Sequence, residues 1–207
     1  MEMIRLLRKG AEADLYLCRW HGMTCVAKVR IGKSYRRREL DERIRRERTR
    51  HEARMLHVVR SAGIRTPYVI DVDLDEYTLV MEYLNGHVLR DLLNSEDVNV
   101  EMKAGLAGEM GRCLAALHAH GIAHGDLTTS NMILVDGKLC FIDLSLASLD
   151  IDVEEMGVDL RLAREALESA HPGLNLFEHL LRSYSEWVGA EEAISRLRET
   201  DRRGRYR

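Results

Sequence analysis

The sequence lacks the features that define several protein classes. No apolar run approaches the roughly 20 residues that a membrane-spanning helix needs, so we expect no membrane contact. The four cysteines show no paired spacing of the kind that binds metal ions, and no signal peptide precedes them. A formal net charge of -3 on 207 residues gives no general reason to expect nucleic-acid binding. These absences indicate a soluble cytoplasmic protein with reduced thiols, either an enzyme or an adaptor.

Lysine and arginine are nevertheless concentrated in two blocks, residues 28–50 and the chain end at 202–207. Such blocks can form interaction surfaces in a protein whose overall charge is small. In the first block, four cations precede a helix and cannot all be paired with local acids, which predicts a binding surface. An ordinary solvated surface is the alternative. The four cations are Lys33, Arg36, Arg37 and Arg38.

The second block has four arginines in six residues and no acid among them. We expect the preceding helix to end near Glu199 and Thr200, because Gly204 among the arginines disfavours its continuation. A mobile basic arm would suit phosphate backbones, and Tyr206 could stack on a base. The alternative is a frayed terminus without function.

Hydrophobic periodicity predicts an α+β protein, with a small sheet followed by a helix-rich region. The predicted strands are 14–20, 24–30, 69–73, 77–82, 132–135 and 138–142. The predicted helices are 39–62, 87–94, 99–120 and most of 153–199. The pattern changes after residue 84, which predicts an N-terminal lobe over 1–84, a C-terminal lobe over 85–201 and a basic tail over 202–207. Small-molecule sites tend to lie in clefts between such lobes.

Three oxygen-bearing side chains, Asp126, Asn131 and Asp143, gather around one predicted loop and one hairpin. The pattern His-x-Asp-x4-Asn followed by a later Asp is what a phosphoryl-transfer site needs. One carboxylate orients the attacking hydroxyl, while an amide and a second carboxylate hold Mg²⁺ on the nucleotide phosphates. Mg²⁺ takes few protein oxygens and leaves the remainder to phosphate and water. The spacing therefore predicts Asp126 as the catalytic residue, with Asn131 and Asp143 as metal ligands.

Lys28 lies in the middle of an apolar strand, where it either pairs with nucleotide phosphates or is simply exposed. A glutamate from the long helix could form an ion pair with this lysine and align it. Glu52 is the better candidate because Met55 and Leu56 follow it by three and four residues, which places it beside the buried face. Glu47 would lie on a different face. The joint order of lysine, glutamate, catalytic loop and second aspartate argues against coincidence.

Together these segments resemble the eukaryotic-type protein kinase superfamily. The match is closest to one small branch, the atypical kinase subunit of the KEOPS complex. That complex is the archaeal and eukaryotic assembly for threonylcarbamoyl-adenosine in tRNA. The resemblance covers essentially the whole chain and is carried by residues 33–36, 40–41, 48–54, 124–131 and 203–205. It implies a minimal bilobal kinase fold that binds ATP and Mg²⁺. It also implies a threonylcarbamoyltransferase partner subunit, a small regulatory subunit, and contact with tRNA through the complex.

The resemblance also implies roles for individual residues. Lys28 would contact the phosphates and Glu52 would hold it, while Asp126 would be the catalytic base. The implied nucleotide-binding residues are Gly10, Ala11, Glu12, Ala13, Lys28, Glu52, Glu82 and Asn131. His118 and His120 end a predicted helix, where we expect them to cap and pack against it rather than to bind zinc. For His124 we expect a structural hydrogen bond to the backbone near Asp143.

Three departures from ordinary protein kinases matter. The nucleotide-covering segment, residues 9–14, has one glycine where three are usual, and Glu12 in it could hinder the γ-phosphate. Gly125 replaces the usual arginine, so a phosphorylated activation loop has no basic anchor. Only residues 146–152 separate the Asp143 motif from the next helix, which predicts that a peptide-docking platform is absent. These departures argue against ordinary protein-substrate phosphorylation more than against nucleotide binding.

Three functional classes fit the sequence. The favoured class is an ATP-dependent enzyme that phosphorylates itself or hydrolyses ATP in service of the complex. A small-molecule phosphotransferase of the antibiotic- or choline-kinase kind shares the loop, but it usually needs a larger helical lobe. A nucleotide-binding scaffold without turnover would not need a catalytic base, whereas Lys28, Asp126, Asn131 and Asp143 are all present.

Overall fold

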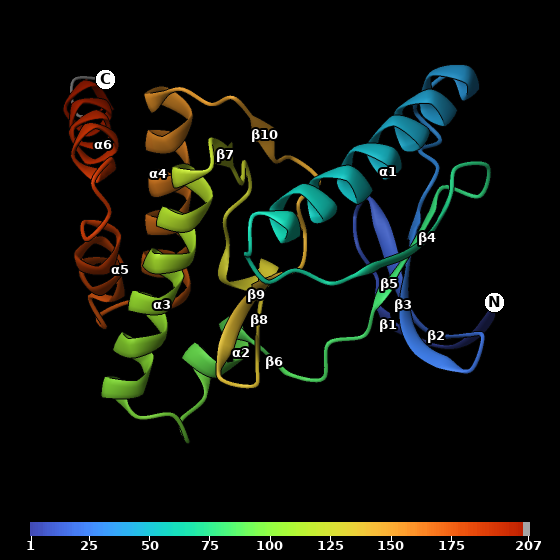
Figure 1. Ribbon diagram of the computed structural model, residues 1–207, viewed down its shortest axis with the longest axis horizontal. Helices are drawn as coiled ribbons and strands as arrows, with labels where there is room; N and C mark the ends of the chain where they lie inside the picture. Colours follow the sequence, from blue (N-terminus) through green and yellow to red (C-terminus); the bar gives the residue numbers. More distant parts are fainter. Residues whose placement is uncertain (205–207) are drawn as a thin grey trace. The chain divides into compact units, whose positions relative to one another are not determined.

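The computed structural model describes residues 1–204, which form an α+β chain with an antiparallel sheet followed by helices (Figure 1). The chain divides into two compact units. The N-terminal unit comprises residues 1–61 and 66–85, and the C-terminal unit comprises residues 62–65 and the chain from Gly86 onward. The predicted fold class is confirmed.

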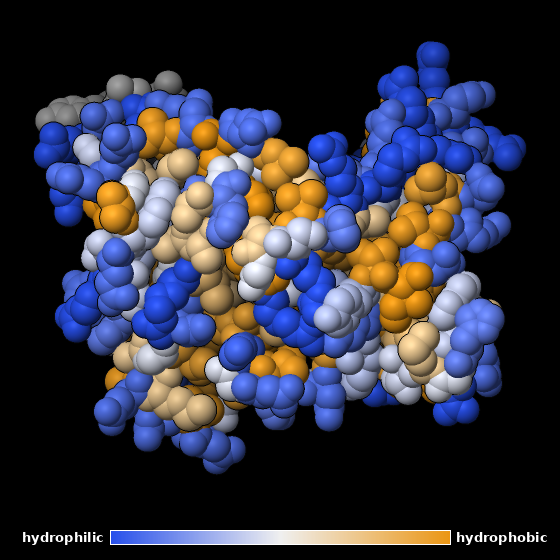
Figure 2. All heavy atoms as spheres, viewed as in Figure 1, coloured by the Kyte–Doolittle hydropathy of each residue, from blue (hydrophilic) through white to orange (hydrophobic). Residues whose placement is uncertain are grey.

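The N-terminal unit is a five-stranded antiparallel sheet in the order β1-β2-β3-β5-β4, accompanied by one long helix. Its elements are β1 (Glu2–Arg8), β2 (Ala13–Trp20), β3 (Met23–Arg30), α1 (Arg38–Ser61), β4 (Val69–Asp73) and β5 (Thr78–Glu82). Buried Met55, Leu56 and Val59 give α1 an apolar face, as its periodicity predicted. Figure 2 shows hydrophilic side chains gathered over the N-terminal half of this helix, which belongs to the first basic block.

A two-residue turn fixes the register of β2 and β3. Trp20 pairs with Met23, and the two residues between them, His21 and Gly22, both have positive φ (46° and 86°). Positive φ at both positions is the signature of a type I′ turn, whose twist matches that of the flanking strands. The turn thereby sets which residues of β2 lie opposite residues 28 and 30 of β3, which share one face of the sheet by the strand period.

Strand β1 was missed in the sequence prediction. It is an edge strand whose neighbour is β2, and six of its seven residues are exposed. A strand exposed on both faces has no apolar alternation, so its sequence carries no period that distinguishes it from a loop. Its place in the sheet comes from backbone hydrogen bonds to β2 rather than from side-chain burial.

The C-terminal unit is mostly helical and holds two small sheets, β6-β8-β9 and β10-β7. Its elements are β6 (His87–Val88), α2 (Leu89–Asn94), α3 (Val100–Ala119), β7 (Ile122–Ala123), a 3₁₀ turn (Thr129–Asn131), β8 (Met132–Val135), β9 (Lys138–Phe141), β10 (Ser148–Leu149), α4 (Val153–Ala170), α5 (Leu176–Tyr184) and α6 (Ala190–Gly204). The predicted helical region 153–199 is thus three helices. Asp152 begins α4 with a capping box, in which its side chain accepts from the backbone and Glu155 reaches back.

Helices α3 and α5 pack at close range in this unit. A Cβ atom added to Gly111 of α3 would lie 2.2 Å from the carbonyl oxygen of Leu180 in α5, a distance that no side chain can occupy. Buried Met110, Leu114 and Leu117 surround this contact on α3. The core of the unit therefore depends on a helix pair whose separation is set by the smallest residue.

The predicted end of the last helix was wrong. Helix α6 continues past Thr200 to Gly204, the last residue that the structure describes. Of the mobile arm predicted over 202–207, residues 202–204 belong to this helix, and residues 205–207 lie outside the described part of the chain.

No helix within residues 1–204 combines the length and apolar character needed to cross a bilayer. The four cysteines are free thiols, and three of them, Cys18, Cys25 and Cys140, are buried.

Candidate functional site

The N-terminal unit brings Lys28 and Glu52 together. Lys28 Nζ lies 2.6 Å from Glu52 Oε1, and both side chains are almost fully removed from water. Lys28 comes from β3 and Glu52 from the apolar face of α1, the arrangement that the strand and helix patterns predicted. In a protein kinase this ion pair aligns the lysine with the nucleotide phosphates.

Glu52 has a second cation that the sequence analysis missed. Arg30 Nη2 lies 2.6 Å from Glu52 Oε2, and the Arg30 side chain is only 3% exposed. Arg30 follows Lys28 by two residues, so the strand period alone places both on the same face of the sheet. That period was the signal that could have revealed it. One buried carboxylate is therefore shared by a lysine on one oxygen and an arginine on the other.

The nucleotide-covering segment is held in place by its own backbone and by the residues after β3. Gly10 N–H donates to Asp14 Oδ1 at 3.2 Å, and Ile31 N–H donates to the carbonyl oxygen of Glu12 at 3.0 Å. Lys33 Nζ donates to the carbonyl oxygen of Ala11. A Cβ atom on Gly10 would lie 2.4 Å from the Ala13 carbonyl oxygen, so the single glycine of the segment stands where the backbone leaves no room for a side chain.

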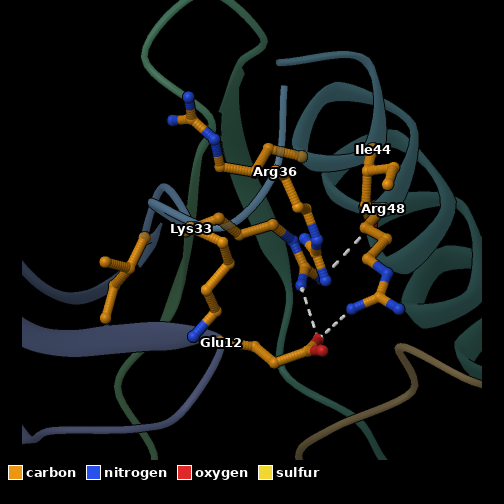
Figure 3. Close-up of a pocket in the computed structure, with 8 residues that line it drawn as sticks. Glu12, Lys33, Arg36, Ile44 and Arg48 are labelled. Atoms are coloured by element: carbon orange, nitrogen blue, oxygen red, sulfur yellow. Dashed lines mark hydrogen bonds and ion pairs between the residues drawn. The ribbon is translucent and has the colours of Figure 1, made fainter. Parts of the chain in front are cut away.

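Glu12 points away from this segment toward the basic residues of α1 and β3 (Figure 3). Its carboxylate forms an ion pair with Arg48 and lies 4.0 Å from Arg30 Nη1. Partial burial would raise the pKa of Glu12, but the neighbouring Arg48, Arg30 and Arg36 lower it below its ordinary value. The glutamate expected to oppose the γ-phosphate is thus held as an anion by arginines.

Glu82 lies at the end of β5 and is engaged with the strand connection. Its backbone N–H donates to the carbonyl oxygen of Tyr68 at 2.8 Å, and its Oε2 accepts from the Tyr68 N–H at 3.1 Å. These two bonds close the end of the sheet where the chain leaves β5.

The catalytic loop of the C-terminal unit brings Asp126 and Asn131 together. Asn131 Nδ2 donates to the Asp126 carbonyl oxygen at 2.9 Å and to Asp126 Oδ2 at 3.1 Å. With its amide nitrogen committed in this way, the Asn131 carbonyl oxygen is the atom suited to a cation. Asp126 itself is exposed. The amide thus orients the carboxylate of the predicted base.

Asp143 is placed beside this loop by the end of β9. The Ile142 N–H donates to the Asn131 carbonyl oxygen at 3.0 Å, which joins the two predicted metal ligands through adjacent backbone. Asp143 Oδ1 accepts from the Ser145 N–H at 3.1 Å and from the Ser145 hydroxyl at 2.5 Å. These bonds fix the direction of the carboxylate.

The donor set suits Mg²⁺ better than zinc. Among residues 1–204, no group of three or more His, Cys, Asp and Glu side chains could hold a metal ion by itself. One amide oxygen and one carboxylate are hard ligands, and Mg²⁺ commonly takes one or two such ligands and completes its shell with phosphate and water. The residues present therefore fit a nucleotide-bound Mg²⁺.

Asp159 of α4 holds the backbone of the catalytic loop, a role that the sequence analysis missed. It is fully buried, and its two oxygens accept from the backbone N–H groups of His124 at 2.6 Å and Gly125 at 2.8 Å. The available signal was the same as for Lys28: a charged residue on an apolar face, here beside Leu160 of the helix.

Of the two histidines expected to cap and pack at the end of α3, His120 is the C-cap residue and its Nδ1 lies 2.8 Å from the Ala116 carbonyl oxygen. His118 packs inside the unit and supports Asp159 instead of capping the helix. Its Nε2 lies 3.2 Å from Asp159 Oδ2, and its Nδ1 lies 2.7 Å from the Tyr184 hydroxyl. Because a carboxylate oxygen only accepts, Nε2–H is the donor in the first contact. His118 lies in the last turn of α3 and follows buried Leu114 by four residues, so the helix period turns its side chain toward the interior of the unit.

The hydrogen-bond partner predicted for His124 was also wrong. The Asp126 N–H donates to His124 Nδ1 at 3.3 Å, so the histidine bonds to the backbone of the predicted base rather than to the backbone near Asp143. Burial lowers the pKa of His124 despite the nearby carboxylates, which favours the neutral ring that can accept this bond. The ring also lies 5.2 Å from that of Phe141.

The shared carboxylate predicts a coupled effect on stability. In Lys28→Met, Arg30 still neutralises Glu52, so we expect the free energy of unfolding to fall by less than about 2 kcal/mol. The double variant Lys28→Met/Arg30→Met removes both of these cations from the buried Glu52 carboxylate and should be destabilised by roughly 3–5 kcal/mol. Urea unfolding measures both, with Arg19→Met on the exposed side of β2 as the control. Effects that simply add would show that the two cations act independently.

The backbone bonds of Asp159 predict a local effect on the catalytic loop. An amide can accept through one oxygen only, so Asp159→Asn leaves one buried N–H unpaired, at a cost of roughly 1–3 kcal/mol. Hydrogen exchange should speed up at the His124 and Gly125 amides, while amides of α1 keep their protection. Glu168→Gln on the exposed side of α4 is the matched control. Unchanged exchange at both loop amides would contradict the assigned role.

Comparisons with known proteins agree on one family. A sequence model of the RIO domain matches residues 23–156. The KEOPS complex subunit Bud32 of Pyrococcus abyssi is 41% identical over 99% of this chain and 97% of its own length. A probable serine/threonine-protein kinase BUD32 homolog of Archaeoglobus fulgidus is 38% identical over 95% and 94%.

Other relatives are longer. A probable bifunctional tRNA threonylcarbamoyladenosine biosynthesis protein of Methanothermobacter thermautotrophicus is 39% identical over 97% of this chain, which spans 36% of that protein. Among solved structures, the Rio2 kinase-ADP/Mg²⁺-phosphoaspartate complex from Chaetomium thermophilum superposes with a TM-score of 0.67. It covers 98% of this chain and 72% of that one at 15% identity, which shows a shared fold.

Proposed function

The chain belongs to the RIO domain family and to the family of the KEOPS complex subunit Bud32, and we propose that it is a Mg²⁺-dependent ATPase or serine/threonine kinase that supports threonylcarbamoyl-adenosine formation in tRNA. The proposal treats residues 1–84 and 85–201 as the two lobes of a minimal kinase, and residues 202–207 as a basic tail. Family membership favours this activity over a small-molecule phosphotransferase or a scaffold without turnover.

The observation that carries the proposal is the orientation of Asp126 by Asn131. An exposed carboxylate whose direction is fixed by an amide can align a hydroxyl or water and accept its proton. Asn131 and Asp143 would hold Mg²⁺, which neutralises developing charge on the phosphates when bound. Lys28, aligned by Glu52, would contact the same phosphates. Together these side chains would align the nucleophile and hold the phosphates that it attacks.

Hydrolysis or self-phosphorylation suits this chain better than phosphorylation of protein substrates. Only a short segment joins Asp143 to α4, and it contains the two-residue strand β10 paired with β7. The carbonyl oxygen of Leu146 in this segment would lie 2.3 Å from a Cβ atom on Gly125, so the segment folds directly onto the catalytic loop. The segment between Asp143 and α4 is too short to form the peptide-docking platform of a protein kinase.

We further propose that the subunit works in the cytoplasm with a threonylcarbamoyltransferase subunit and a small regulatory subunit, and that it contacts tRNA through basic residues. Two of the four cations singled out near α1 are paired locally, Arg36 with Asp41 and Arg38 with Glu42. Lys33 donates to a backbone carbonyl oxygen. Because these three cations already have partners within the chain, we expect Arg37 and the tail to make the contacts with tRNA.

Two aspartate variants test the chemistry. Asp126→Ala and Asp143→Ala should each reduce ATP turnover by at least about 100-fold, the first by losing alignment of the nucleophile and the second by losing a metal ligand. Asp143→Ala should also weaken Mg-ATP binding in calorimetry, whereas Asp126→Ala should leave it nearly intact. Asp97→Ala, at an exposed aspartate of the same unit, is the control. Turnover that survives in Asp126→Ala would overturn the assignment of the base.

Deletion of residues 202–207 tests the tail. ATP binding by the free subunit should not change, because the deletion removes no residue assigned to nucleotide or metal. The assembled complex should bind tRNA more weakly, with a salt dependence shallower by about one unit of slope for each phosphate group that the tail had neutralised. A variant with glutamine at Arg205 and Arg207 keeps the chain length and serves as the comparison. An unaltered salt slope would mean that the tail does not touch nucleic acid.

A further inference from the structure

The pocket beside Glu12 holds an excess of positive charge. Five cations line it, and among the lining residues the only carboxylate is that of Glu12 (Figure 3). We call these five the basic pocket: Arg30, Lys33, Arg36, Arg45 and Arg48. Two further carboxylates, Asp41 and Glu52, pair with its arginines from outside. Because Lys28 shares Glu52 with Arg30, six positive charges face three negative ones, which leaves this set with a net charge of three.

Most of the pocket is fixed by buried pairs. Glu52 holds Arg30 at 2.6 Å, and Asp41 holds Arg45 at 2.8 Å and Arg36 at 3.5 Å. These carboxylates are nearly inaccessible to water, with side-chain exposures of 1% and 7%. The guanidinium groups that they hold are therefore fixed in place before any ligand arrives, which lowers the cost of binding one.

Glu12 is the exception, because its side chain is 50% exposed and it belongs to the nucleotide-covering segment. Its carboxylate reaches Arg48 and lies 4.0 Å from Arg30 Nη1. Exposed ion pairs contribute little to stability and exchange readily. Glu12 thus behaves as an internal anion that occupies a site built by fixed arginines and can leave it.

We propose that the basic pocket is a phosphate-binding site in which a phosphate group takes the place of the Glu12 carboxylate. Arginine forks bind phosphate through two parallel N–H bonds, and phosphate offers more oxygens and more negative charge than a carboxylate. Arg48 and the Nη1 group of Arg30 would bind it, with Lys33 within reach at the edge. Displacement of Glu12 removes the tie between the nucleotide-covering segment and α1, so occupancy of the pocket alters that segment.

The test is calorimetric titration of inorganic phosphate into the full-length subunit, saturated with Mg²⁺ and a non-hydrolysable ATP analogue, at constant ionic strength. The wild-type protein should bind phosphate. Glu12→Gln removes the competing anion and should tighten binding by about tenfold, the factor expected if Glu12 occupies the site for about nine-tenths of the time. Arg48→Met should weaken binding at least about tenfold, and Arg48→Lys, which keeps charge without the fork, should weaken it less. Arg19→Met should change nothing.

Three results would overturn the site: no phosphate binding to Glu12→Gln, binding only in the absence of the nucleotide analogue, or unchanged binding in a folded Arg48→Met. The second would mean that the pocket is merely where a nucleotide phosphate sits. A second arm adds tRNA. If tRNA competes with inorganic phosphate for the wild-type protein but not for Arg48→Met, the site is supported and an RNA phosphate is its ligand. If phosphate binds and tRNA does not compete, the site is supported and the free ion is its ligand. The inferred effect of phosphate on the nucleotide-covering segment rests on the proposed function. Because the titration does not measure ATP turnover, the phosphate site and the proposed function can fail separately.

Discussion

A carboxylate that is removed from water must be neutralised or fully hydrogen-bonded, and this constraint shapes both units of the molecule. In the N-terminal unit, Glu52 meets it with two cations, one on each oxygen. In the C-terminal unit, Asp159 meets it with two backbone N–H groups and a histidine. Each carboxylate thereby fixes the groups around it: Lys28 in the first case and the catalytic loop in the second.

Patterns that depend on local sequence were sufficient for much of the fold and part of the site. The strand period placed Lys28 in β3, the helix period placed Glu52 on the apolar face of α1, and the loop motif brought Asp126 beside Asn131. Two kinds of feature escaped. Strand β1 has no buried face and so no period, and Asp159 contacts a loop that lies 34 residues earlier in the chain. Such long-range partners are set by tertiary packing and leave only an indirect signal, a charged residue on an apolar face.

The departures from ordinary protein kinases have a common physical explanation. Gly125 has a φ of 76° and contacts the Leu146 backbone closely, so an arginine at this position would be excluded by both conformation and space. The short segment after Asp143 takes the place that a longer activation segment would need. In the nucleotide-covering segment, hydrogen bonds to Asp14, Ile31 and Lys33 supply order that does not depend on further glycines.

The close packing of α3 on α5 reaches further than the helices themselves. Gly111 lets α5 approach until its Leu180 carbonyl oxygen nearly touches the α3 backbone, and Tyr184 lies one turn later on α5. Tyr184 bonds to His118, which bonds to Asp159, which bonds to the backbone before Asp126. The spacing of the two helices therefore affects, through three side chains, the position of the backbone that carries Asp126. The absence of a side chain at Gly111 in the core thus helps to set the position of a loop at the surface.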